Sequence, residues 1–258
     1  MLALVACATA TALWTSACTP GDGVAQRDSA RTVGDTAAHA APPPYAVTAP
    51  AQWGSVAGVV AADRALAQDT TVIPIGADSD CGTTLRIPLV EVRGGRLAGA
   101  VVSLDARVGK PLPAARRFEL MHAHCAIEPH VQGVLAGGTL NVKSDDAAVV
   151  EMRFAHPESD STLAMVRQTD AGQVVPVTGL FRQAGIIEVT SDTHPWMRAW
   201  IRVFDQPYFD VTDRRGAFRL DSVPPGTYQL SAWHDRLGTH TQTVTVRPGE
   251  ETRVTVQF

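Results

Sequence analysis

The sequence lacks the features of several large protein classes. Its 22 Lys and Arg residues are outnumbered by 26 Asp and Glu, so the formal net charge is −4. Without an excess of positive charge there is no field to attract nucleic acid, and we expect no nucleic-acid partner. Neither the Gly-x-Ser-x-Gly elbow of a hydrolase nor the His-Glu-x-x-His zinc motif occurs. We therefore expect a protein that is not an enzyme.

Charged residues are absent from the first 18 positions, which are rich in Ala, Leu, Val and Thr. The apolar part is short for a membrane span, which favours a secretory leader over residues 1–18 and an exported protein, in the periplasm or on the outer surface. Cys18 is the preferred lipidation site, so that membrane contact would be through a lipid anchor. Cys7 ends a tetrapeptide closer to the lipoprotein pattern but leaves a shorter leader, and plain cleavage near Ala17 is the third alternative.

Large apolar side chains are scarce in residues 19–53, where Ala, Pro, Thr and Gly dominate. Such a composition buries too little apolar surface to order itself. We expect a disordered linker that holds the folded part away from the membrane.

Cysteine is also scarce, with 4 in the chain and only Cys81 and Cys125 after the leader. In an exported chain, two remaining cysteines suggest one disulfide. A pair of free thiols is the alternative.

Short β-branched runs with Gly and Pro between them fill the sequence from Gly54 onward, and only residues 63–68 suggest a helical turn. Regularly spaced short strands are typical of an all-β sandwich. The turn Arg93-Gly94-Gly95-Arg96 predicts a hairpin. The expected strands cover residues 55–60, 84–92, 97–104, 118–122, 130–134, 139–142, 149–154, 174–180, 186–190 and 197–203.

In the last of these strands two faces can be distinguished, because alternate residues point to opposite sides. One face carries Met197, Ala199, Ile201 and Val203 and fits a core. The other carries Trp196, Arg198, Trp200 and Arg202, and we expect neighbouring structure to cover it. An exposed aromatic platform for a ligand is the alternative.

The C-terminal segment contains strong turn signals. Gly216 supplies the positive φ of a hairpin bulge, and Val223-Pro224-Pro225-Gly226 predicts a type II turn. With the Thr-Asp, Gly-x-Phe and Val-Pro-x-Gly-x-Tyr elements between Asp210 and Phe258, the segment resembles the carboxypeptidase regulatory-like, transthyretin-like module. The resemblance implies a small β-sandwich at residues 205–258 that binds, braces or presents rather than catalyses.

Three further stretches resemble exported proteins with a plastocyanin-like cupredoxin domain. They are Asp80-Cys81-Gly82, Cys125 to Val131, and the run from His194 to Phe209. The resemblance implies a cupredoxin-like Greek-key β-sandwich over residues 54–204.

In cupredoxins one loop supplies a Cys, a His and a Met to copper, and a second His comes from an earlier strand. Here His194 and Met197 keep their positions, but Ser191 replaces the cysteine and Val150 the earlier histidine. A blue-copper centre requires the thiolate sulfur. The resemblance therefore implies a degenerate site, in which His194 and Met197 are vestigial ligands or bind Cu(I) weakly.

His122 and His124 are a second candidate metal pair, because residues i and i+2 of a strand point the same way. Histidines in loops are often merely solvated, which is the alternative. A catalytic role is less well supported for the stretch Trp233-His234-Asp235 and for His240. Adjacent strand residues such as His234 and Asp235 face opposite sides, so the aspartate is not placed to orient the histidine as a general base.

These features together predict a non-catalytic cell-envelope protein that binds or scaffolds, with a glycan or another envelope protein as partner. No cofactor is expected. The alternative is a periplasmic copper-binding or electron-transfer protein that uses His194, Met197, His122 and His124.

Overall fold

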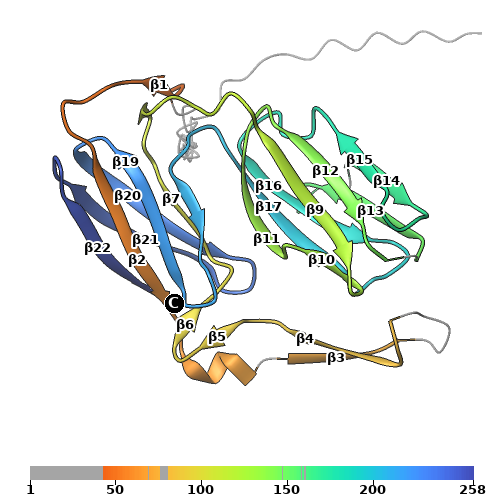
Figure 1. The fold of residues 1–258 in the computed structure, drawn as a ribbon. Coiled ribbons are helices and arrows are strands. Elements are labelled where there is room, and N and C mark those ends of the chain that lie inside the picture. Colours follow the sequence, from red (N-terminus) through yellow and green to blue (C-terminus); the bar gives the residue numbers. More distant parts are fainter. Residues whose placement is uncertain (1–42, 69, 76–80, 147, 158, 160) are drawn as a thin grey trace, which may run out of the picture. The chain divides into compact units, whose positions relative to one another are not determined.

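The computed structural model describes residues 43–258 apart from 69, 76–80, 147, 158 and 160 (Figure 1). In this part of the chain the elements are strands, with one short 3₁₀ helix, η1 (Arg64–Gln68). The predicted all-β class is confirmed. The expected leader, Cys7, Cys18 and most of the expected linker lie outside the described residues. No helix in the described residues has the length and hydropathy needed to cross a membrane.

One β-sandwich combines strands from both ends of the described chain, and we call it the split sandwich. Its first sheet has β2 (Gly54–Ala61) between β19 (Ala217–Val223) and β22 (Glu251–Gln257). Its second sheet has the order β18 (Phe209–Val211), β7 (Val101–Leu104), β20 (Gly226–His234) and β21 (Gly238–Val246). The largest fully buried side chains of its core include Leu97, Leu104, Tyr208 and Leu230.

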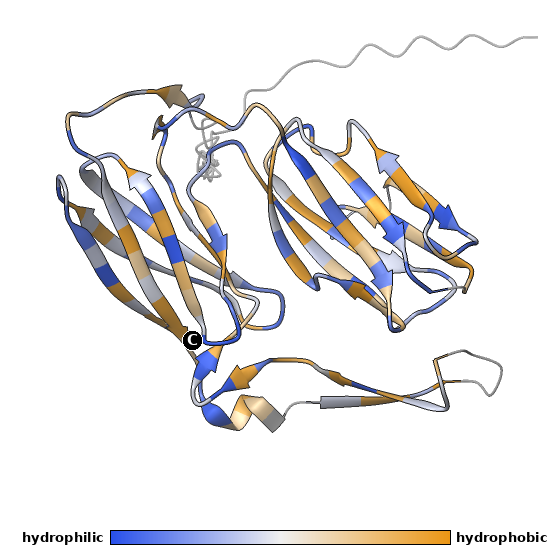
Figure 2. Cartoon of the chain, viewed as in Figure 1, coloured by the Kyte–Doolittle hydropathy of each residue, from blue (hydrophilic) through white to orange (hydrophobic). Residues whose placement is uncertain are grey.

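Alternating side chains explain why these strands pack face to face. Along β19 the buried residues Phe218 and Leu220 alternate with the exposed Arg219 and Asp221, and bands of hydrophobic and hydrophilic colour repeat along the strands (Figure 2). Gly58 lets the neighbouring strands approach, because a Cβ there would lie 2.2 Å from the carbonyl oxygen of Val254.

A second β-sandwich is formed by residues 117–204, and we call it the inserted sandwich. One sheet has the order β10 (Ala126–Glu128), β9 (Arg117–Ala123), β12 (Thr139–Ser144) and β15 (Val174–Val177). The other has the order β11 (Val131–Leu135), β17 (Arg198–Phe204), β16 (Gly185–Ser191), β13 (Val150–Ala155) and β14 (Thr162–Gln168). Phe154, Phe181 and Met197 are among its fully buried core residues.

The inserted sandwich interrupts a hairpin of the split sandwich. β7 and β18 are antiparallel neighbours, with Val102 opposite Asp210, yet residues 105–208 lie between them in sequence. The expected division into 54–204 and 205–258 therefore differs from the strand pairing, because β2 and β7 complete the sheets of the C-terminal module. Inserting a domain between adjacent strands is compatible with both folds, since the ends of a domain are often close together.

Polar contacts close the neck where the chain enters and leaves the inserted sandwich. Arg107 forms an ion pair with Asp205 at 2.8 Å. The Tyr208 hydroxyl accepts a hydrogen bond from the Lys110 amide and donates one to the Ser222 carbonyl. Nearby, the short β1 (Ala46–Val47) pairs with β8 (Val108–Gly109).

A hairpin arm leaves the split sandwich between β2 and β6 (Arg96–Leu97). It consists of β3 (Thr70–Pro74) and β4 (Thr84–Pro88). The predicted disulfide is confirmed: Cys81 in this arm is bonded to Cys125 of the inserted sandwich, with their Cα atoms 5.7 Å apart. The arm is thus covalently attached to the inserted sandwich.

The structure divides two of the predicted strands and adds several, of which β3 and β14 are the longest. Residues 84–92 form β4 and the first residue of β5 (Val92–Arg93), while residues 97–104 are broken before β7. Gly99 has a φ of 71°, which an extended strand does not allow. The hairpin across Arg93–Arg96 is confirmed by the β5–β6 pairing. β14 was not predicted because its apolar residues Leu163 and Met165 are exposed and show no clear alternation.

The Trp and Arg face of β17 is covered only in part: Trp200 and Arg202 are partly buried, Arg198 is exposed, and Trp196 precedes the strand. The Trp200 ring packs edge-on against Trp233 of the split sandwich, with ring centroids 6.0 Å apart. The Arg202 guanidinium lies 5.2 Å from the centroid of the same Trp233 ring. This face therefore packs against other parts of the chain and is not an open aromatic platform.

Candidate functional site

The four positions that correspond to copper ligands lie at one end of the inserted sandwich. Val150 begins β13 and Ser191 ends β16, two neighbouring strands. The loop after Ser191 is tied to β13 by the Asp192 amide, which donates to the Glu151 carbonyl at 3.1 Å. Met197 follows in this loop and is buried in the core.

Ser191 stabilises the loop conformation. Its hydroxyl oxygen accepts a hydrogen bond from the His194 amide at 3.1 Å, as a serine does in a tight turn. The Met197 amide donates to the His194 carbonyl at 2.8 Å, and the Ser191 amide donates to the Met197 carbonyl. The loop is therefore held by its own hydrogen bonds without a metal ion.

These residues do not fit a blue-copper centre. Val150 is fully buried and has no donor atom, while Ser191 is buried and its hydroxyl is hydrogen bonded within the loop. The two described cysteines, Cys81 and Cys125, are bonded to each other. Since the blue-copper set needs a thiolate, the chemistry of that centre is not available here.

The prediction that His122 and His124 face one metal ion is wrong in its geometry. β9 ends at Ala123, and His124 and Cys125 form a two-residue turn with φ values of 52° and 61°. Positive φ at both positions is typical of a type I′ hairpin turn. His124 is exposed, whereas His122 is completely buried, so the strand alternation assumed for the pair ends before His124.

His122 instead lies close to His194. Their ring centroids are 6.1 Å apart, and the His122 Nε2 atom is 3.2 Å from Oδ2 of Asp146. Sequence reasoning considered both histidines but missed Asp146, which precedes β13 and carries no local signal of its role. We call His122, Asp146 and His194 the histidine cluster.

The pKa values in the histidine cluster follow from its burial. Burial lowers the pKa of His122, an effect that Asp146 partly opposes and His194 reinforces. Burial likewise lowers the pKa of His194, with Asp146 again opposing it. Both rings are therefore kept neutral near pH 7, because a charged imidazole would lose its hydration in this environment. In the described residues, no three His, Cys, Asp or Glu groups already converge as a metal-binding set.

A second polar cluster surrounds Asp235, which follows β20. The side chain of Asp235 is 96% buried and lies 3.4 Å from Nε2 of His130 and 3.3 Å from Nδ1 of His234. His130 also donates from Nδ1 to the Arg198 carbonyl. Sequence reasoning singled out His234 and Asp235 but did not connect them with His130, which lies just before β11 in a distant segment. His240 is exposed, and its ring lies at a tilt against Phe258 with the centroids 4.5 Å apart.

The arrangement around Asp235 is one of structural ion pairing. Burial raises the pKa of this carboxyl, but the hydrogen bond and charge of His130, with His234 and Arg236, outweigh it, and the net pKa is lowered. Burial lowers the pKa of His234, whose Nδ1 accepts a hydrogen bond from the Arg236 amide. Among the described residues, no Ser, Thr or Cys nucleophile is hydrogen bonded to His130 or His234.

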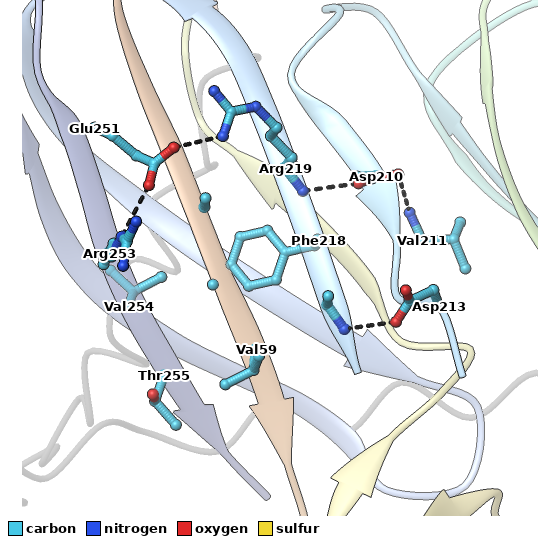
Figure 3. Close-up of a pocket in the computed structure, with 13 residues that line it drawn as sticks. Val59, Asp210, Val211, Asp213, Phe218, Arg219, Glu251, Arg253, Val254 and Thr255 are labelled. Atoms are coloured by element: carbon cyan, nitrogen blue, oxygen red, sulfur yellow. Dashed lines mark hydrogen bonds and ion pairs between the residues drawn. The ribbon is translucent and has the colours of Figure 1, made fainter. Parts of the chain in front are cut away.

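A surface groove on the outer face of the β19–β2–β22 sheet has a volume of about 810 Å³ (Figure 3). Small side chains of the central strand, Ala57 and Val59, contribute to its lining. On one side, Arg219, Glu251 and Arg253 form a continuous ion-paired row. We call this feature the sheet groove.

Two aspartates line the other side of the sheet groove. Asp210 accepts hydrogen bonds from the amides of Val211 and Arg219, and Asp213 accepts from the amides of Arg215 and Ala217. Glu251 has its pKa lowered mainly by the hydrogen bond from Arg219, followed by that from Arg253. The carboxylates of the groove thus act as fixed acceptors, which suits binding better than proton transfer.

One comparison with known proteins agrees with a resemblance seen in the sequence. Residues 185–258 match the family model of the carboxypeptidase regulatory-like domain, so the predicted module is confirmed. The matched range includes β16 and β17, which the structure places in the inserted sandwich. No curated protein matches the chain.

Solved structures similar to the chain include cupredoxins. Amicyanin from Paracoccus versutus is 16% identical, with a TM-score of 0.30. The match covers 97% of the amicyanin chain and 40% of this chain. Auracyanin from Roseiflexus castenholzii is 12% identical, with a TM-score of 0.31. The match covers 99% of the auracyanin chain and 36% of this chain. A copper-containing nitrite reductase from Thermus scotoductus is 18% identical, but only 24% of its chain is matched by 40% of this one, with a TM-score of 0.30.

Proposed function

We propose that the chain is a non-catalytic, exported binding protein whose ligand occupies the sheet groove. The observation that carries this proposal is the groove itself, which combines a floor of small side chains with fixed charged groups along both sides. A glycan is the ligand class that fits best. Its hydroxyls can pair with guanidinium and carboxylate groups, while the apolar face of a sugar ring can lie over Ala57 and Val59.

Export is supported by the Cys81–Cys125 disulfide, because disulfides persist in oxidising compartments. Lipid attachment at Cys18 is part of the same proposal. It rests on the sequence alone.

Binding of the purified protein to a panel of immobilised glycans tests the proposal. Ala57→Trp should abolish binding, because the indole would fill the floor of the sheet groove. Thr241→Trp is the matched control, since Thr241 is exposed on β21 of the opposite sheet. Equal glycan binding by both variants, or the absence of binding by the unaltered protein, would contradict the proposal.

A second candidate function, copper binding for electron transfer, is favoured by the retention of His194 and Met197. The replacement of Val150 and Ser191 argues against it on the grounds given above. An intense blue band on addition of Cu(II) would overturn the conclusion that the chain has no blue-copper centre.

A further inference from the structure

His122 is a buried histidine without a hydrogen-bond partner. Its side chain is 0% exposed, and neither Nδ1 nor Nε2 makes a hydrogen bond to any described residue. Leaving a buried polar group unpaired destabilises the folded state, so such groups in native proteins call for an explanation. The carboxylate of Asp146 is 3.2 Å from Nε2, yet its orientation does not form a hydrogen bond.

We propose that His122, Asp146 and His194 together bind one divalent transition-metal ion, at a site separate from the lost blue-copper set. Two imidazoles and a carboxylate, with no sulfur, are a donor set typical of Zn²⁺. Neither Met197 nor a thiolate takes part. The site therefore goes beyond the glycan-binding function and is independent of the sheet groove.

The distances suit a shared ion. With bonds of about 2.0–2.2 Å to a tetrahedral Zn²⁺, a nitrogen and an oxygen ligand lie about 3.3 Å apart, close to the 3.2 Å between His122 and Asp146. At the same tetrahedral angle, two imidazoles bound to one ion have ring centroids about 5 Å apart. The centroids of His122 and His194 are 6.1 Å apart, so the His194 ring has to move about 1 Å toward His122 when the ion binds.

Neighbouring groups orient the proposed ligands. Asp146 accepts the amides of His124 at Oδ1 and of Cys125 at Oδ2, which fixes its carboxylate beside His122. Nδ1 of His194 lies 2.9 Å from the hydroxyl of Thr193, which leaves Nε2 for a metal ion. Contacts of this kind fix the tautomer and direction of ligands in established metal sites.

An ion can reach the histidine cluster from solvent. The Asp146 side chain is 25% exposed and His194 is only partly buried, whereas His122 closes the inner end. The Trp196 ring packs against His194 with centroids 5.1 Å apart and donates from Nε1 to the Cys125 carbonyl. The site thus has a polar opening and an aromatic wall.

Isothermal titration calorimetry of the full protein with ZnCl₂ tests the proposal. We expect one Zn²⁺ per chain, and at least about a tenfold loss of affinity in His122→Gln and in His194→Gln, since even the loss of a group supporting a ligand typically weakens binding 10–100-fold. His124→Gln is the matched control, because His124 is exposed and lies in the adjacent turn. Its affinity should be unchanged.

Three results would overturn the proposal. They are no uptake of Zn²⁺ by the unaltered protein, unchanged affinity in the folded His194→Gln variant, or loss of binding in His124→Gln alone. His194 lies in a partly exposed loop, so His194→Gln decides the question even if the buried His122→Gln variant does not fold. Cu(II) added in place of Zn²⁺ should bind without an intense blue band, which separates this site from a cupredoxin centre.

Discussion

Individual histidines in this chain are set apart by burial rather than by sequence context. His122 and His124 are two positions apart, yet one is enclosed in a core and the other lies in an exposed turn. His234 is buried next to Asp235, whereas His240 is exposed on the following strand. A buried neutral histidine links stability to pH, because only the unfolded chain takes up its proton.

We predict that acid destabilises the protein in two stages. Burial lowers the pKa of His234 in the folded state, so the unfolded state binds more protons and stability falls as the pH drops below about 6.5. The net pKa of Asp235 is lowered in the folded state, so this carboxylate stabilises the fold at pH values above its pKa in the unfolded chain, about 4. This contribution is lost as the pH falls further. Unfolding midpoints measured between pH 7.5 and pH 3 check both stages.

The His234→Gln variant isolates one part of this effect. Below pH 6.5, its free energy of unfolding should fall less steeply with pH than that of the unaltered protein. The two slopes should differ by up to about 1.4 kcal/mol per pH unit, which corresponds to one proton. His240→Gln, at an exposed position, is the control. Identical pH dependence in the His234→Gln variant and the unaltered protein would contradict the assignment.

At the scale of elements, the β3–β4 arm is joined to the inserted sandwich by a disulfide and not by strand pairing between described residues. Few sheet contacts hold the hairpin, since β3 pairs only with β4 among the described strands. The Cys81–Cys125 disulfide closes a separation of 44 residues. In the chain-entropy model such a bond stabilises the folded state by roughly 4 kcal/mol.

We predict that the double variant Cys81→Ser, Cys125→Ser loses stability up to roughly that 4 kcal/mol. Denaturant unfolding of the variant measures the loss. The unaltered protein treated with a reducing agent should unfold at the same midpoint as the double variant. A variant as stable as the oxidised protein would show that the arm is held by packing alone.

At the scale of the whole molecule, the main finding is that the C-terminal module is not continuous. β18 and β20 pair with β7, and β19 and β22 pair with β2, so every described C-terminal strand except β21 has a partner from residues 54–104. Between the two halves, the Ala100 amide donates to the Thr212 hydroxyl across 112 positions.

This organisation predicts which fragments fold. Residues 205–258 alone should remain unfolded, because removing β2 leaves β19 and β22 without their partner and exposes their buried faces. Residues 43–258 with 106–206 replaced by a short glycine linker should fold, since β7 and β18 are adjacent in the sheet. Circular dichroism and amide proton dispersion distinguish the outcomes, and a folded 205–258 fragment would contradict the pairing.

Much of the fold was predictable because its signals are local. The Arg93–Arg96 hairpin follows from two glycines with positive φ, and Gly216, with a φ of 68°, forms the turn expected before β19. The loop from Ser191 to Met197 was recognised from the spacing of its residues. Alternation also placed Ala199, Ile201 and Val203 in a core correctly.

The candidate sites were predictable only in part, because they join distant segments. His122 and His194 each stood out by residue type, but nothing near either of them in the sequence indicates that their rings lie 6.1 Å apart. Asp146 was missed, and His130 was not connected with Asp235, for the same reason. Arg219, Glu251 and Arg253 are ordinary exposed charges until β19, β2 and β22 are placed side by side.

The sequence by itself determined the all-β class, the turns, the two cysteines available for a disulfide and the absence of a thiolate at position 191. Each of these depends on residue identity or on backbone preferences within a few positions. Only the tertiary structure decided that residues 105–208 are inserted into a hairpin and that His122 faces Asp146 and His194. The physical reason is that strand pairing and core packing bring together segments far apart in the chain, and such contacts leave no local pattern.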